Sequence, residues 1–159
     1  MLLQVEPLRK VTGELRSARR CPPKYTPKAS SAMAKLGLSY ERKIVRDLMR
    51  SVWLVEHNPW FEFQDELGVS TCCPDIILTA DSKIIVIEVK LTWVPEAIEK
   101  LRGLYCPVVE YALAAEVFPL IIVKNLRPDA PPVQDSVQRA LESEMPILQW
   151  IGSGHIPWL

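Results

Sequence analysis

The sequence has no long apolar segment and no recognisable export signal. No run of about 18 apolar residues occurs, so we expect no membrane-spanning helix and no membrane partner. The first residues, MLLQVEPLRK, lack the charged-then-apolar order of a secretory signal. We therefore expect a cytoplasmic protein. Its composition, 48% hydrophobic and 24% charged, is typical of a globular domain and argues against wholesale disorder.

Histidine and cysteine are too few and too poorly spaced to predict a zinc site. The two histidines, His57 and His155, have no partner at metal-ligand spacing, and we interpret both as structural. The four cysteines include no CxxC pair, and the adjacent Cys72 and Cys73 are unsuitable as a zinc clamp. We interpret all four as reduced thiols.

Net charge is also absent, but the zero total hides an uneven distribution. Residues 1–50 contain 12 Lys and Arg against 4 Asp and Glu, a balance of +8, and residues 51–159 carry the opposite balance. A basic segment of this kind neutralises phosphates and releases their counterions, which is the general source of affinity for nucleic acid. A solvated charged tail without a partner is the alternative interpretation.

The chain is long enough for one compact domain with a basic, proline-containing arm before it. Residues 1–30 include the stretch RSARRCPPKYTPKAS, which predicts an extended or irregular N-terminal arm. From residue 31 to 159 the pattern is that of a single folded domain.

Periodicity within this domain predicts alternating helices and strands. Apolar residues recur every four positions and predict an amphipathic helix over 30–55, capped by Ser30 or Ser31, with an apolar face formed by Leu36, Tyr40, Ile44, Leu48 and Val52. We expect an α/β fold with a central mixed β-sheet flanked by helices. The other predicted elements are a strand at 60–63, a loop at 64–73, a hairpin of strands 74–80 and 83–93, helices at 95–104, 108–115 and 131–145, and a strand at 118–126.

Charged residues stand at the ends of the two hairpin strands, which are otherwise apolar. Asp75 begins one strand in PDIILTA, and Glu88 and Lys90 lie near the end of the next in KIIVIEVKLTW. A turn near 81–82 places Asp75 alongside residues 87–89, and Glu88 and Lys90 share one face of the sheet. Buried charges of this kind need neutralisation. A Mg²⁺ ion held by carboxylates, with a lysine beside the attacking water, would provide it.

The sequence has PD at 74–75 and EVK at 88–90, with twelve residues between them. This pattern resembles the motif of the PD-(D/E)xK nuclease superfamily, which has the restriction-endonuclease-like fold. The resemblance covers about residues 36–125. It implies a metal-dependent deoxyribonuclease in which Asp75, Glu88 and the Val89 carbonyl bind Mg²⁺, with Mn²⁺ able to substitute, and Lys90 activates the water.

The same resemblance implies a further acid from the preceding helix. Glu41 is the matching candidate, both as a metal ligand and as a catalytic residue; otherwise it is a surface glutamate. Asp47 is the weaker alternative on the helix, and Glu62 and Gln64 on the next strand are two more.

Within the superfamily, the size and order of elements are most similar to Holliday junction resolvases. These act on branched DNA as homodimers, and both properties are therefore expected here. The basic residues expected to bind DNA are Arg16, Arg19, Arg20, Lys24, Lys28, Lys35, Arg42 and Lys43.

Three other interpretations stay open. RecB-like and lambda-type exonucleases carry a QxxxY pattern on the helix after ExK, and Tyr105 matches its tyrosine while Leu101 replaces its glutamine. A catalytically silent module of the same fold that binds nucleic acid is the second. A protein-binding domain is the third, but it leaves the basic arm unexplained.

Overall fold

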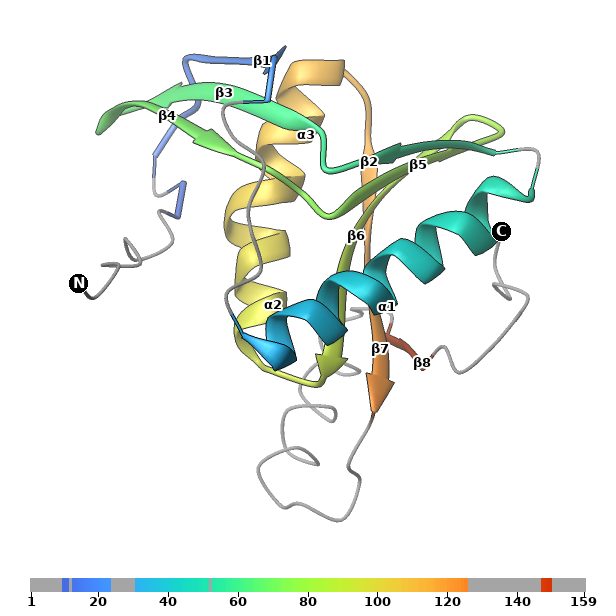
Figure 1. Ribbon diagram of the computed structural model, residues 1–159. Helices are drawn as coiled ribbons and strands as arrows, with labels where there is room; N and C mark the ends of the chain where they lie inside the picture. Colours follow the sequence, from blue (N-terminus) through green and yellow to red (C-terminus); the bar gives the residue numbers. More distant parts are fainter. Residues whose placement is uncertain (1–9, 12, 24–30, 52, 126–146, 150–159) are drawn as a thin grey trace.

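The computed structural model describes residues 10–11, 13–23, 31–51, 53–125 and 147–149. These residues form an α/β fold in which a mixed sheet is flanked by helices, as predicted (Figure 1). The elements are β1 (Ser17–Cys21), α1 (Ala32–Met49), β2 (Leu54–His57), β3 (Trp60–Asp65), β4 (Gly68–Cys72), β5 (Ile76–Ala80), β6 (Lys83–Thr92), α2 (Glu96–Lys100), the π-helical turn η1 (Leu101–Tyr105), α3 (Cys106–Leu113), β7 (Val117–Asn125) and β8 (Ile147–Gln149).

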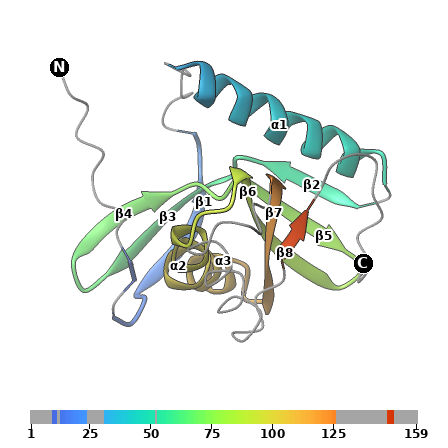
Figure 2. The ribbon, with the colours of Figure 1, turned by 90° about the horizontal axis from the view of Figure 1, so that it is seen from below.

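The central sheet has five strands in the order β2-β5-β6-β7-β8. The pairs β2–β5 and β5–β6 are antiparallel, while β6–β7 and β7–β8 are parallel. Figure 2 shows α1 on one side of β6 and β7, with α2 and α3 on the other. Both faces of the middle strands are therefore covered, which explains their continuous runs of isoleucine and valine.

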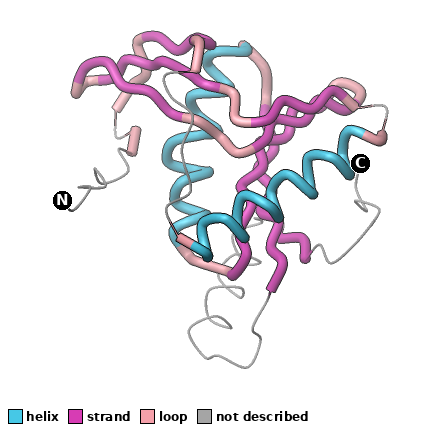
Figure 3. Tube along the Cα trace, viewed as in Figure 1, coloured by secondary structure: helices cyan, strands magenta, loops and turns pink. Residues whose placement is uncertain are grey.

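A smaller antiparallel sheet, β1-β3-β4, continues from the central one. Only short bends separate β2 from β3 and β4 from β5, so one long hairpin passes through both sheets (Figure 3). The loop predicted at 64–73 is wrong. Residues 65–68 form a tight turn with Gly68 at φ +109°, and Gly68 is also the first residue of β4, GVSTC. Residues 17–21 of the predicted arm form β1, which pairs with β3.

The predicted first helix is confirmed as α1, with Ser31 as its N-cap. The Ser31 hydroxyl accepts a hydrogen bond from the Ala34 amide at 3.1 Å. The buried face consists of Tyr40, Ile44, Val45 and Leu48. Two details of the prediction are wrong. Leu36 is 55% exposed, and the helix ends at Met49 because residues 54–55 pair with β5.

The helices after the hairpin form one nearly continuous rod. We predicted two segments at 95–104 and 108–115, whereas α2, η1 and α3 follow one another without a break. The predicted strand at 118–126 is confirmed as β7. The predicted helix at 131–145 lies outside the described residues.

Candidate active site

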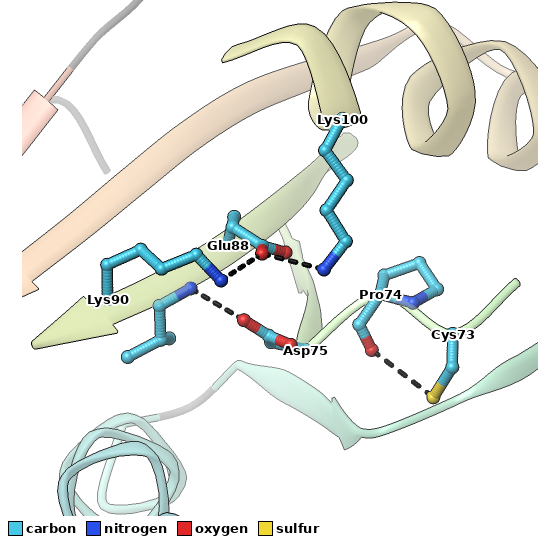
Figure 4. A network of polar contacts seen from close by, with 7 residues as sticks. Cys73, Pro74, Asp75, Glu88, Lys90 and Lys100 are labelled. Carbon is cyan, nitrogen blue, oxygen red and sulfur yellow. Dashed lines mark hydrogen bonds and ion pairs between the residues drawn. The ribbon is translucent and has the colours of Figure 1, made fainter. Parts of the chain in front are cut away.

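The hairpin β5–β6 brings Asp75 and Glu88 together, as the sequence predicted. Ile76 pairs with Ile87, so the next residues outward, Asp75 and Glu88, lie side by side. Asp75 Oδ2 accepts a hydrogen bond from the Val89 amide at 2.8 Å (Figure 4). The N–H and C=O of one strand residue point to the same edge, so the Val89 carbonyl also faces this side of β6.

Glu88 is fully buried and has two lysines on one carboxylate oxygen. Its Oε1 accepts hydrogen bonds from Lys90 Nζ at 2.5 Å and from Lys100 Nζ at 2.8 Å (Figure 4). Its Oε2 is buried and has no hydrogen-bond partner among the described residues. An unpartnered carboxylate oxygen in a protein interior is costly, and it marks a position where a ligand atom would be bound.

Lys100 is the site residue that sequence reasoning missed. It ends α2, reaches down to Glu88, and its ammonium also lies 4.8 Å from the centre of the Tyr105 ring. The sequence contained a signal for it. Ala97, Leu101 and Leu104 are buried at helical spacing, and Lys100 falls on the same stripe, where an unpaired lysine would be unfavourable.

Burial and neighbouring charges change the protonation of the site. Burial, together with the Glu88 carboxylate, raises the pKa of Asp75 to about 7, and the two lysines oppose this rise. Burial alone would lower the pKa of the Lys90 ammonium. The carboxylates of Glu88 and Asp75 outweigh that effect and raise the pKa above its usual value. Lys90 is therefore a cation and a hydrogen-bond donor in this arrangement.

Glu41 lies near this cluster but is bonded elsewhere. Its Oε1 is 2.6 Å from His57 Nε2, and the Asn58 side-chain amide is 3.0 Å from the same nitrogen. Its negative charge also contributes to the raised pKa of Asp75. Among the described residues there is no group of three or more His, Cys, Asp or Glu side chains placed to hold a metal ion. Glu41 as a third ligand therefore stays a prediction.

The alternatives to Glu41 have other partners. Asp47 lies 3.7 Å from Arg50 on the same helix, Glu62 lies in an ion pair with Arg19, and Gln64 pairs with Ser17 in the small sheet. Among the described residues, no hydrogen bond or ion pair joins any of these three side chains to Asp75 or Glu88.

The donor set of the site nevertheless fits a hard divalent cation. Two carboxylates and a backbone carbonyl lie where the β5–β6 pairing ends, and Glu88 Oε2 is an available ligand atom. Mg²⁺ needs only one or two protein carboxylates when waters and phosphate oxygens complete its coordination. The neighbouring thiol is unsuited to this role, because burial and the charge of Asp75 raise the pKa of Cys73 to about 12.

The predicted DNA-binding residues occupy different surroundings. Arg19 and Arg20 form ion pairs with Glu62 and Glu56, so their charges are balanced within the small sheet and its neighbour β2. Four other residues of the predicted set are exposed: Arg16, Lys35, Arg42 and Lys43. The last two, Lys24 and Lys28, lie outside the described residues.

Comparison with known proteins gives little information. No known protein family matches the sequence, and no curated protein matches it. Among solved structures, the chain is similar to the crystal structure of protein VC1899 from Vibrio cholerae, with 14% identity and a TM-score of 0.44. The match covers 69% of this chain and 27% of that one.

In the part of the chain that the structure describes, no helix is long and apolar enough to cross a membrane.

Proposed function

We propose that this protein is a metal-dependent DNA endonuclease that hydrolyses phosphodiester bonds. The observation that carries the proposal is the buried Glu88 carboxylate, which has two ammonium groups on one oxygen and, among the described residues, no partner on the other. A buried ion pair is favourable only when hydrogen bonds also satisfy its remaining lone pairs. The unsatisfied oxygen beside Asp75 is what a cation-binding site presents before its ion is bound.

Asp75, Glu88 and the Val89 carbonyl are the groups that would hold Mg²⁺ or Mn²⁺, with Glu41 as a further ligand if it leaves His57. When bound, such an ion polarises a phosphoryl group and lowers the pKa of its water. The Val89 amide fixes the orientation of the Asp75 carboxylate through its hydrogen bond.

The two lysines provide donors for the phosphate and for the water. Lys90 and Lys100 are 30% and 20% exposed, so both side chains are accessible to a phosphate placed over Glu88. Because Lys90 is protonated, it acts by orienting the water and donating to a phosphate oxygen, not by accepting a proton. Water attacks phosphorus and loses a proton to solvent, the bond to the leaving oxygen breaks, and that oxygen takes up a proton from solvent, so that no net proton is stored in the site.

We further propose that the preferred substrate is branched DNA, cut by a homodimer of the Holliday junction resolvase kind. The basic N-terminal third of the sequence supports DNA as the partner.

One observation favours a second candidate function, a silent nucleic-acid-binding module. Two lysines already neutralise Glu88, and no third ligating side chain joins the acidic pair among the described residues. In that case the ion cluster would be structural and the protein would bind DNA without cutting it.

Cleavage assays distinguish these functions. A labelled four-way junction, linear duplex and single strand are incubated with Mg²⁺, Mn²⁺ or EDTA, using wild type, Glu88→Gln and Lys90→Met. Exposed residues of the same type supply controls, Glu99→Gln and Lys83→Met. We expect metal-dependent cleavage to fall at least about 100-fold in the site variants and to persist in the controls.

The pattern of products then decides the subclass. Paired symmetric nicks in the junction indicate a resolvase, and progressive shortening of linear ends indicates an exonuclease. Binding of DNA without cleavage by the wild type, under every metal condition, contradicts the nuclease proposal and favours the silent module.

A further inference from the structure

A cavity of about 340 Å³ lies between α1 and the carboxyl ends of the parallel strands β6 and β7. Its α1 side presents Met33, Leu36, Tyr40, Lys43 and Arg46, which recur at helical spacing along one stripe. Its volume lies within the range of pockets that bind small molecules. We call it the α1 groove.

The α1 groove is cationic. Three of its lining residues, Lys43, Arg46 and Lys124, are basic, and the described residues that line it include no Asp or Glu. Lys124 Nζ lies 6.0 Å from the centre of the Tyr40 ring at the floor of the groove. In a chain with zero net charge, this concentration of one sign is complementary to an anionic ligand.

The same groove carries exposed apolar surface. Met33 is 64% exposed and Leu36 is 55% exposed, both on the stripe that also holds Lys43. A ligand that matches the groove therefore combines negative charge with an apolar part. An unpaired nucleotide has both, since its phosphate is anionic and its base presents an open face. A duplex presents its phosphates but keeps its base faces stacked inside.

The groove and the candidate active site use neighbouring residues of two elements but lie on opposite faces of β6. Tyr40 of the groove precedes Glu41 on α1. Leu91 of the groove follows Lys90 on β6, so its side chain points to the other face of the sheet. Beyond Glu88, no described strand pairs with β6 on its β5 side, because the β5–β6 pairing ends at Ile76 and Ile87. A strand of nucleic acid that crosses this open edge of β6 would contact both the α1 groove and the candidate active site.

We propose that the α1 groove binds an unpaired nucleotide of single-stranded nucleic acid next to the site of cleavage. Its phosphates lie against Lys43, Arg46 and Lys124, and its base lies against Met33 and Leu36. The neighbouring phosphodiester then lies at Glu88 and Lys90. Only this last placement rests on the proposed nuclease function; binding in the groove does not.

Binding measured without metal tests the inference independently of cleavage. A fluorescently labelled oligothymidylate and a duplex of equal length are titrated with the full chain in EDTA, and anisotropy is recorded at several salt concentrations. The test variant is Lys43→Gln with Arg46→Gln. The matched control is Arg50→Gln with Lys83→Gln, which removes the same charge from exposed positions outside the groove and outside the set of residues expected to bind DNA.

We expect the groove variant to weaken single-strand binding about tenfold, and to reduce the slope of log affinity against log salt by about 1.4, from two phosphate contacts. The control pair should change affinity less than about threefold. An apolar pair completes the design, since Leu36 and Met49 are 55% and 56% exposed on the same helix. Leu36→Ser should lower single-strand affinity about threefold and leave duplex affinity unchanged, whereas Met49→Ser should change neither.

Three results would overturn the inference. Equal losses from both glutamine pairs would mean that general electrostatic attraction, not the groove, binds the strand. Duplex binding at least as tight as single-strand binding, with the same dependence on Leu36, would contradict the unpaired nucleotide. Absence of binding to either nucleic acid, with a lowered melting temperature in the groove variant, would mean that the chain itself covers the groove. Groove-dependent binding without any cleavage would leave this inference standing and reject the nuclease proposal alone.

Discussion

Removing the Lys100 ammonium should destabilise the metal-free protein more than removing any ordinary surface lysine. In Lys100→Met the buried Glu88 keeps only Lys90 as a counter-charge, and the contact with the Tyr105 ring is lost. A hydrogen bond to a charged group contributes about 1.5–3 kcal/mol, and a cation–π contact about 0.5–1 kcal/mol. We therefore expect a loss of about 3 kcal/mol, which lowers the melting temperature by about 6–12 °C.

Thermal and urea unfolding in EDTA measure this loss, and Lys83→Met is the control. Lys83 is exposed at the start of β6, so its replacement should change stability by less than about 0.5 kcal/mol. Saturating Mg²⁺ should recover part of the loss in Lys100→Met, because an ion at the Glu88 carboxylate replaces the missing positive charge. A variant that unfolds like wild type in EDTA would refute the idea that Lys100 neutralises Glu88.

Three further predictions follow from the site and the hairpin. The folded-state pKa of Asp75 is raised to about 7, so in the metal-free protein this group lowers stability progressively as the pH rises from about 4 to 7. Asp75→Asn should remove this dependence of stability on pH. In EDTA the variant should be more stable than wild type by about 2–4 kcal/mol above pH 7 and equally stable near pH 4. Urea unfolding of both proteins across this pH range measures the difference, and parallel pH profiles would contradict the prediction. Glu41→Gln should weaken Mn²⁺ binding in calorimetric titrations while His57→Ala preserves or tightens it, and unchanged affinity in Glu41→Gln would exclude Glu41 as a ligand. Gly68→Ala should cost about 1–2 kcal/mol in unfolding free energy because the turn needs φ +109°, and a wild-type denaturation midpoint would show that the turn relaxes without strain.

The part of the site that sequence could predict is the part fixed by local geometry. A tight turn and a period of two set the register of β5 against β6, and that register alone places Asp75 beside Glu88. The buried face of α1 follows in the same way from a four-residue spacing. Both predictions need only interactions between residues that are close in the chain.

The missed features depend on contacts between distant segments. The strand β1 exists because Ser17–Cys21 find an open edge at β3, about forty residues later in the chain. Leu54 and Val55 leave the helix for the same kind of reason, since β5 offers them a partner. Glu41 binds His57 because the end of β2 passes close to α1. The spacing of residues along α1 cannot predict this contact with a separate strand.

The charges where the β5–β6 pairing ends are those that the proposed metal site needs, and stability alone gives no reason for them. Buried ion clusters are often replaced by well-packed apolar residues with no loss of stability, and sometimes with a gain. The surrounding strands are built from isoleucine and valine, so an apolar residue at position 88 would match its neighbours. Instead Glu88 is buried with an unsatisfied oxygen, and Asp75 beside it is held with a raised pKa, both at a cost in folding free energy. Strain of this kind is concentrated at sites where a ligand relieves it, and a divalent cation shared by the two carboxylates would relieve both costs at once.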